Sequence, residues 1–149
     1  KFAYDFGDTG NRTPLVKMHT LGSSFMPPAT HSGGLRYHGM APMVSHLTDI
    51  GAIEAKAYGQ KECFDAGVQF ANAEGIVPAP EATHAVKGAI DEALECKKNG
   101  QKKTILFNLC GHGHFDMQAY GDYFDNKLSD DSYNEAAVNK ALEKLPKIA

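Results

Sequence analysis

The sequence predicts an α/β fold in which a mostly parallel sheet lies between two layers of helices, a three-layer α/β/α arrangement. After Pro42, short apolar runs typical of strands alternate with longer amphipathic runs typical of helices, and this strand–helix order repeats three times. The run Thr104–Leu109 is almost continuously apolar, as expected of a strand that helices cover on both faces. Alternation of this kind implies parallel strands joined by right-handed helical crossovers.

The first elements after Pro42 are a predicted helix and a predicted strand. Gly51 ends the helix, because glycine readily adopts the left-handed conformation found just beyond many helices. Apolar and polar residues then alternate over Ile53–Tyr58, which is the pattern of a strand. The apolar stripe of the helix consists of Val44, Leu47 and Ile50.

Two further helices are predicted with a short strand between them. Lys61–Glu74 has apolar residues at helical spacing and stops at Gly75, and Ile76–Ala79 is a short strand closed by Pro80. Glu81–Lys98 has the clearest helical periodicity of the chain. Its apolar residues are Ala82, Ala85, Val86, Ala89, Ile90, Ala93 and Leu94.

The carboxyl-terminal third begins with the strand Thr104–Leu109. A helix is expected to start near His114, after a glycine-rich turn. The last helix is expected to open at Ser132, with Glu135 three residues later completing a capping box.

The first 42 residues differ from the rest in composition. They are rich in glycine and proline and show no sustained periodicity, yet they contain many large apolar side chains. Such a segment is too apolar for a solvated tail, so we expect Lys1–Pro42 to be an ordered arm that packs on another surface. Residues 43–149 are then the α/β portion of the protein.

Composition excludes several classes of function. The formal net charge of -3 argues against nucleic acid as a partner, because phosphate binding needs a basic face. No apolar stretch approaches membrane-spanning length, which predicts no membrane partner. The cysteines Cys63, Cys96 and Cys110 are odd in number and widely spaced, which favours a reduced, cytoplasmic chain over a disulfide framework.

A candidate site follows from the ends of two predicted strands. In an open parallel sheet, ligands bind at the carboxyl ends of the strands. Glu81 follows the strand Ile76–Ala79, and Cys110 follows the strand Thr104–Leu109. Both residues are therefore expected at the same edge of the sheet.

The stretch Cys-Gly-His-Gly-His, residues 110–114, allows four interpretations. His112 and His114 suggest a metal site, with His31, His38 or His84 as possible further ligands, although no ligand spacing typical of zinc is present. Cys110 on a sharp turn suggests a nucleophile with His84 or Glu81 as its partner, although Asn108 stands where a nucleophile elbow usually has glycine. A third interpretation is a non-covalent bed for a flat cofactor, and the fourth is a buried, inert cysteine. The spacing of these residues alone does not distinguish the four interpretations.

Several stretches resemble the tryptophan synthase beta chains. "EGIVPAPEATHA" (74–85) is similar to that family's Glu-Gly-Ile-(Ile/Val)-Pro-Ala-x-Glu-x-x-His-Ala stretch, and "FNLCGHGHFD" (107–116) is similar to its Asn-Leu-Ser-Gly-x-Gly turn. "HSGGLRYHGMAPMVSHLTDIG" (31–51) looks like the family's Ala-Gly-Leu segment and following helix. The arm "YDFGDTGNRTPLVKMHTLG" (4–22), "GLRYHGMAP" and "GHGHFD" resemble the divergent second type of beta chain in particular.

The resemblance implies a pyridoxal-phosphate lyase that makes tryptophan from serine and indole by β-replacement, with part of the large domain of fold type II. It implies that Cys110 takes the place of a serine beside the pyridine nitrogen, that Gly111 flanks the ring, and that Glu81 lies close to it. Arg36 matches the position of a substrate-orienting aspartate. Tyr37 and Gly39 match positions whose backbone carbonyls bind a monovalent cation, Na⁺ or K⁺, and zinc is not expected.

The family's Schiff-base lysine motif, His-Lys-x-Asn, and its Gly-Gly-Gly-Ser-Asn phosphate motif do not occur in this sequence. By resemblance they precede everything present here. We therefore expect a carboxyl-terminal portion, inactive alone, whose partners are the amino-terminal part of the same chain and a second copy in a homodimer. Whether an alpha subunit also binds is left open by the sequence. The absence of an initial methionine agrees with a truncation of natural, proteolytic or designed origin. The alternatives are a self-contained hydrolase using Cys110 and His84, and a non-catalytic small-molecule-binding domain.

Overall fold

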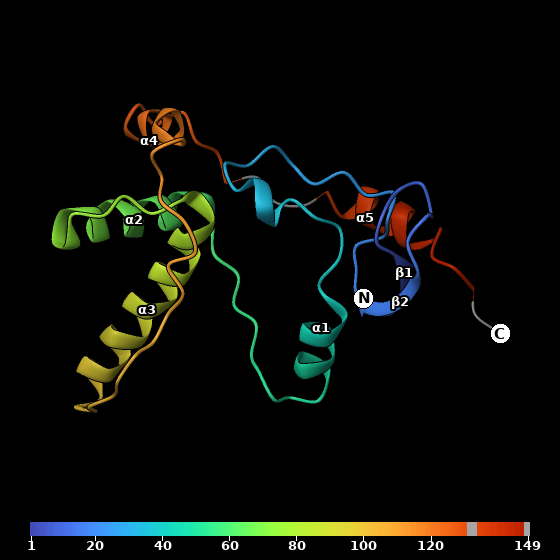
Figure 1. Ribbon diagram of the computed structural model, residues 1–149, viewed down its shortest axis with the longest axis horizontal. Coiled ribbons are helices and arrows are strands. Elements are labelled where there is room, and N and C mark those ends of the chain that lie inside the picture. Colours follow the sequence, from blue (N-terminus) through green and yellow to red (C-terminus); the bar gives the residue numbers. More distant parts are fainter. Residues whose placement is uncertain (131–133, 148–149) are drawn as a thin grey trace. The chain divides into compact units, whose positions relative to one another are not determined.

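The computed structural model describes residues 1–130 and 134–147, and these form two compact units (Figure 1). The first unit comprises residues 1–29, 36–55 and the carboxyl-terminal segment from 131, and the second comprises residues 30–35 and 56–130. Both helices and strands occur, so the chain is mixed α/β. Among the described residues, no helix is long and apolar enough to cross a membrane.

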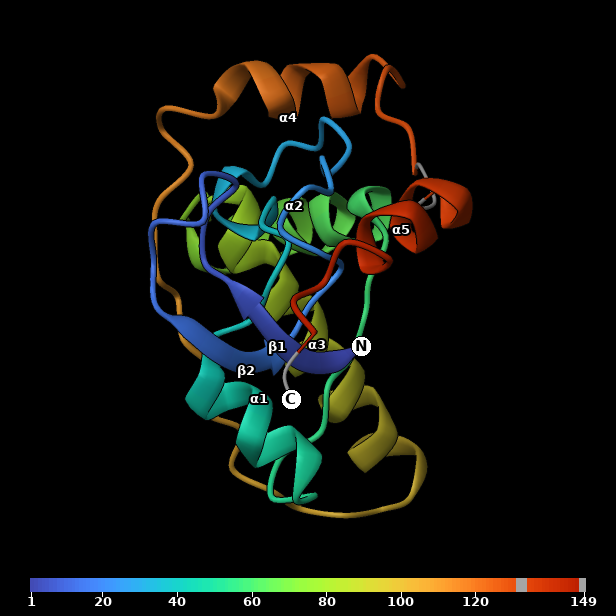
Figure 2. The same ribbon diagram turned by 90° about the vertical axis from the view of Figure 1, so that its right-hand side faces the viewer.

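The first unit is organised around an antiparallel hairpin of β1 (Phe2–Phe6) and β2 (Leu15–His19). Phe2 pairs with His19 and Phe6 with Leu15. The helix α1 (Pro42–Asp49) packs against β2. Ser45 of this helix accepts a hydrogen bond of 2.9 Å at its Oγ from the backbone N–H of His19. The helix α5 (Glu135–Leu142) also belongs to this unit (Figure 2). The hairpin was not predicted, since the arm has no sustained alternation.

A buried polar network ties the hairpin to the segment that follows it. The Asp5 side chain is fully buried, and its Oδ2 accepts a hydrogen bond from Thr20 Oγ1 at 2.7 Å. His38 Nε2 lies 2.8 Å from the Phe6 carbonyl oxygen and 3.9 Å from Asp5 Oδ2. Burying a carboxylate is costly unless it is hydrogen-bonded, so these contacts hold the arm in one conformation.

The second unit contains the 3₁₀ turn η1 (Gly33–Leu35) and the helices α2 (Gln60–Glu74), α3 (Pro80–Lys98) and α4 (Met117–Phe124). The helices α2 and α3 pack on each other, and α2 also contacts α4. The core cluster consists of Phe64, Ala119, Tyr120 and Leu128, with Val68, Val77 and Tyr123 packed against it.

Local signals placed several helix ends correctly. Gly75 ends α2 in the left-handed conformation with φ of 69°, as predicted. The helix α3 begins at Pro80, one residue before the predicted start at Glu81, because proline is favoured at the first helical position. Two predicted starts were wrong. The helix α4 begins at Met117 instead of near His114, and α5 begins at Glu135 with Asn134 as its cap, whose Oδ1 accepts from Ala137 N. Ser132 lies outside the described residues.

None of the predicted strands Ile53–Tyr58, Ile76–Ala79 and Thr104–Leu109 is a strand in the structure, and only Pro78 among their residues takes part in an isolated bridge. Over the described residues the sheet is the antiparallel pair β1–β2, together with isolated antiparallel bridges, so a three-layer parallel sheet is not seen. The physical reason is that a strand, unlike a helix, needs a neighbouring chain segment to satisfy its backbone hydrogen bonds.

Candidate functional site

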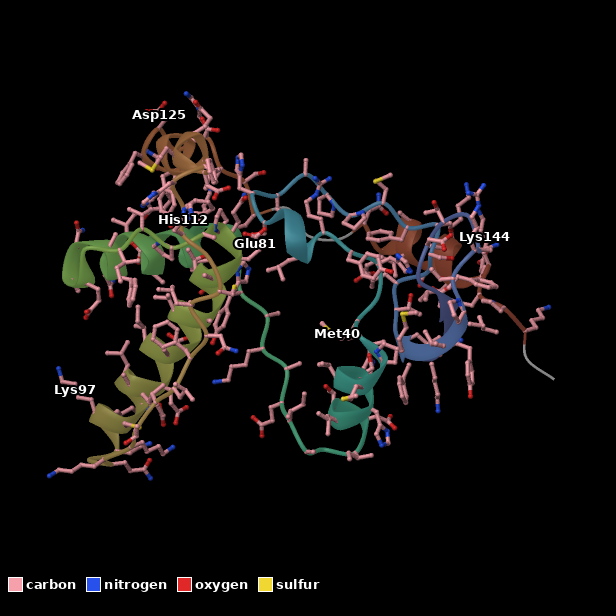
Figure 3. All side chains as sticks on the ribbon, in the orientation of Figure 1. Met40, Glu81, Lys97, His112, Asp125 and Lys144 are labelled. Carbon is pink, nitrogen blue, oxygen red and sulfur yellow. The ribbon has the colours of Figure 1, made fainter. Side chains whose placement is uncertain are left out.

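The turn that carries Cys110 packs against the segment leading into α3. Gly113 N donates to the Val77 carbonyl oxygen at 2.7 Å, and Ala79 N donates to the Gly111 carbonyl oxygen at 2.8 Å. Pro78 and His112 form an antiparallel bridge between these bonds. The two loops that were predicted to converge are therefore joined through their backbones, and the labels of Glu81 and His112 mark this region in Figure 3.

Glycine is required in this turn by close approach of the two backbones. A Cβ built on Gly113 would lie 2.5 Å from the Pro78 carbonyl oxygen and 2.9 Å from Val77 Cγ1. The same oxygen accepts a hydrogen bond of 2.6 Å from Tyr120 Oη. Burial raises the pKa of Tyr120 from 10.0 to about 12, so the phenol stays protonated and keeps this bond even in moderately alkaline solution. Tyr120 of α4 therefore anchors the segment before α3, to which the turn is bonded.

Cys110 is a free, exposed thiol at the start of the turn. The interpretation of this residue as a buried, inert cysteine is therefore wrong for the described chain. A nucleophile elbow would place a helix directly after the cysteine, whereas α4 begins only at Met117. The local geometry thus lacks the helix amino terminus that would activate a thiol.

Glu81 lies in the first turn of α3 and is half-buried. Its Oε1 accepts a hydrogen bond of 2.9 Å from Gly34 N, in the turn η1. The neighbouring His31 donates its backbone N–H to Gln60 Oε1 at 2.8 Å, and its ring packs edge-on against Phe64. Glu81 and His31 together attach the segment 30–35 to the helices. Sequence reasoning missed this contact, and the Gly33–Gly34 pair was the signal that a side chain approaches a backbone here.

The remaining histidines of this unit make local contacts. His84 Nδ1 lies 3.1 Å from the Pro80 carbonyl oxygen of its own helix. His112 and His114 are exposed with ring centroids 4.5 Å apart, and His112 Nδ1 accepts a bond from His114 N. In the part of the chain that the structure describes, no three His, Cys, Asp or Glu side chains are grouped to hold a metal ion.

Arg36, Tyr37 and Gly39 belong to the first unit. Arg36 Nε donates to the Pro28 carbonyl oxygen at 2.8 Å, and Tyr37 Oη donates to the Gly7 carbonyl oxygen. Gly39 forms a bridge with Thr20, and a Cβ built there would lie 2.5 Å from the sulfur of a methionine in β2. The contacts of these three residues therefore lie within the arm, residues 1–42.

Several curated proteins are similar to this chain. "Tryptophan synthase beta chain 2" of Methanosarcina mazei is 62% identical over 128 residues, which are 86% of this chain and 29% of the relative. The protein of the same name from Aquifex aeolicus is 58% identical over 130 residues, 87% of this chain and 30% of the relative. "Tryptophan synthase beta chain" of Pyrococcus horikoshii is 49% identical over 145 residues, 97% of this chain and 31% of the relative.

No protein-family model matches the chain. The identity to named relatives is nevertheless far above the level that chance similarity reaches, and it extends over most of these residues. The chain spans about 29% of the length of the first relatives that it matches. The family predicted from the residue motifs is confirmed: by sequence, this chain is a homologue of one part of the tryptophan synthase beta chains of the second type.

Proposed function

We propose that these residues act as the carboxyl-terminal part of the cofactor-binding domain of a tryptophan synthase beta chain, which joins indole to the side chain of serine by β-replacement. The observation that carries the proposal is the identity of 62% to a protein of that name, over 86% of this chain. The backbone bond from Ala79 N to the Gly111 carbonyl oxygen supports it, because Gly111 follows Cys110 and Ala79 lies two residues before Glu81.

The residues of this turn fit one edge of a pyridoxal phosphate ring. Cys110 offers an exposed thiol that can donate one weak hydrogen bond, and Gly111 adds no side chain that would block a flat ring. Glu81 keeps its second carboxylate oxygen, Oε2, outside the bond to Gly34. When bound, the cofactor withdraws electrons from the substrate carbon. A weak hydrogen-bonding group such as the Cys110 side chain at the pyridine nitrogen would not donate a full proton to it, and would therefore moderate this withdrawal.

We further propose roles for the residues of the first unit. Arg36 orients the substrate through the guanidinium nitrogens that its bond to Pro28 leaves free, since only Nε is engaged there. The backbone carbonyls of Tyr37 and Gly39 bind a monovalent cation in the complete enzyme. The arm 1–42 packs on parts of the parent protein that precede this segment, and residues 43–149 complete a three-layer domain with a parallel sheet.

The covalent anchor of the cofactor lies outside this sequence in our proposal. The sequence contains no His-Lys-x-Asn motif, so no lysine here is expected to bond the cofactor specifically. The 149-residue chain is therefore inactive by itself, and activity needs the amino-terminal part of a beta chain. The complete protein is proposed to be a homodimer, in which an alpha subunit is a further possible partner.

The first test uses the chain by itself. It is incubated with pyridoxal phosphate and reduced with borohydride, and the adducts are located by mass spectrometry. Weak labelling spread over surface lysines is expected. Stoichiometric labelling of one lysine would contradict the proposal, because the chain would then build its own cofactor site.

The second test uses a chimera, defined as the full-length Methanosarcina mazei relative with its matched segment replaced by this chain. The chimera is expected to bind pyridoxal phosphate and to form tryptophan from serine and indole. In the chimera, Cys110→Ser is expected to keep the cofactor, since the hydroxyl replaces the thiol as the hydrogen-bonding group. Loss of the cofactor absorbance on this substitution would refute the role given to Cys110.

A further inference from the structure

Two side chains from different helices hold the short segment of residues 30–35. Gln60 Oε1, at the start of α2, accepts a hydrogen bond of 2.8 Å from His31 N. Glu81 Oε1, in the first turn of α3, accepts one of 2.9 Å from Gly34 N. Both bonds are made to backbone N–H groups of the same segment, so the segment connects Gln60 to Glu81.

Both ends of the Gln60 amide are engaged. Its Oε1 accepts from His31 N, and its Nε2 donates to the Ser129 carbonyl oxygen at 2.8 Å. An amide turned by 180° would place donor against donor and acceptor against acceptor, so only the observed orientation satisfies both bonds. The backbone of α2 is held at this point as well, because Lys61 N donates to Asp130 Oδ1 at 3.0 Å. Gln60 therefore presents an acceptor of defined position to the segment.

The segment is braced between its two attachments. Leu35 N donates to the Ser32 carbonyl oxygen at 2.9 Å, which closes the turn η1 around Gly34. At the start of the segment, the ring of His31 packs edge-on against Phe64 of the core cluster, with centroids 6.4 Å apart. A displacement of the backbone at His31 is therefore transmitted to Gly34.

We propose that Gln60 is a positioning residue of the candidate cofactor site: through residues 30–35 it holds the Gly34 N–H against Oε1 of Glu81, and so fixes the orientation of the Glu81 carboxylate. Within the described part of the chain, Gly34 N is the hydrogen-bond donor to this carboxylate. Without that bond, the half-buried Glu81 side chain regains rotamer freedom. The inference rests on the proposed function for one point, that Glu81 lies close to the pyridoxal phosphate ring.

The first measurement uses the 149-residue chain without cofactor. Gln60→Met keeps the length of the side chain and removes both hydrogen bonds of the amide. Amide hydrogen exchange, followed by NMR, is expected to be about fivefold faster at Gly34, the effect of losing roughly one hydrogen bond. Exchange at Gly113, in the same unit, is expected to change by less than about twofold. The control is Gln69→Met, at an exposed position of α2, which should alter neither amide.

The second measurement is a double-mutant cycle in the chimera. Gln60→Met is expected to lower kcat/KM for serine about fivefold. In a Glu81→Ala background, the same substitution is expected to change kcat/KM by less than about 1.5-fold, because a residue that acts through Glu81 then has nothing left to position. A residue that only stabilises the fold would cause the same loss in both backgrounds.

Three results would overturn the proposal: unchanged exchange at Gly34, equal acceleration at Gly34 and Gly113, or the same loss of kcat/KM with and without Glu81. If Gln60→Met is insoluble, Gln60→Ala makes the same comparison, since it also removes both bonds. A chimera with the unsubstituted chain that forms no tryptophan would refute the proposed function, and with it the role of Glu81 at the cofactor. Exchange at Gly34 would still decide whether Gln60 holds the segment.

Discussion

Gly113→Ala tests whether the turn at Cys110 depends on close approach of two backbones. The added Cβ would lie 2.5 Å from the Pro78 carbonyl oxygen, 2.9 Å from Val77 Cγ1 and 3.1 Å from Tyr120 Cε2. The Pro78 oxygen cannot retreat freely, because the Tyr120 hydroxyl is bonded to it at 2.6 Å. The neighbouring Val77 oxygen is likewise bonded to Gly113 N at 2.7 Å.

The expected loss of stability follows from these contacts. Overpacking a rigid site costs about 1–3 kcal/mol. Moving residues 111–113 away from residues 77–79 also weakens the hydrogen bonds from Gly113 N and from the Tyr120 hydroxyl, each of which contributes about 1 kcal/mol. The free energy of unfolding should therefore fall by ~2–4 kcal/mol, which corresponds to a decrease of ~5–15 °C in the midpoint of thermal unfolding.

Gly121→Ala is the matched control. Gly121 lies in α4, and a Cβ built there would meet nothing within 4 Å. Alanine is favoured over glycine in a helix by about 1 kcal/mol, so this variant should be as stable as the parent or slightly more stable. Thermal unfolding of both variants, measured by circular dichroism, checks the prediction. Equal midpoints for the two variants would show that the turn adapts to a side chain and that close approach of the backbones does not require glycine there.

Three further predictions concern other parts of the chain. Gly22→Ala should destabilise the first unit by ~2 kcal/mol or more, because Gly22 has φ of 97° and an added Cβ would lie 2.8 Å from the Ala141 backbone. The control Gly51→Ala has φ of 72° and open space around the added Cβ, so it should cost only ~1 kcal/mol. Equal unfolding midpoints for these two variants would contradict the prediction. Burial raises the pKa of Cys63 from 9.0 to about 12, so between these values the unfolded thiol ionises while the folded one does not. The contribution of the Cys63 thiol to the free energy of unfolding is therefore fully present below pH 9.0 and is lost as the pH rises toward 12. Cys63→Ala should make the decrease of the unfolding midpoint over this pH range less steep. An equally steep decrease would refute the assignment to Cys63. Asn134→Ala should weaken α5 by ~1 kcal/mol, since the side chain caps this helix by accepting from its third residue, and unchanged unfolding would contradict that role.

The sequence by itself determined the helices whose ends carry local signals. Gly51 and Gly75 stop α1 and α2 because glycine tolerates the left-handed conformation observed at both positions. Helical hydrogen bonds connect residues four apart, so the information that forms a helix lies within one stretch of sequence. The family was also determined by sequence alone, from motifs that the comparison with named relatives bears out.

Only the tertiary structure decided which segments lie against each other. The antiparallel contact of Val77–Ala79 with Gly111–Gly113, the bond from Gly34 to Glu81 and the hairpin of β1 and β2 each join residues distant along the chain. No local pattern specifies such pairs, because a strand acquires its hydrogen bonds from whichever segment packs beside it. For the same reason Thr104–Leu109, which has the composition of a central strand, is unpaired here, and Leu106 is exposed.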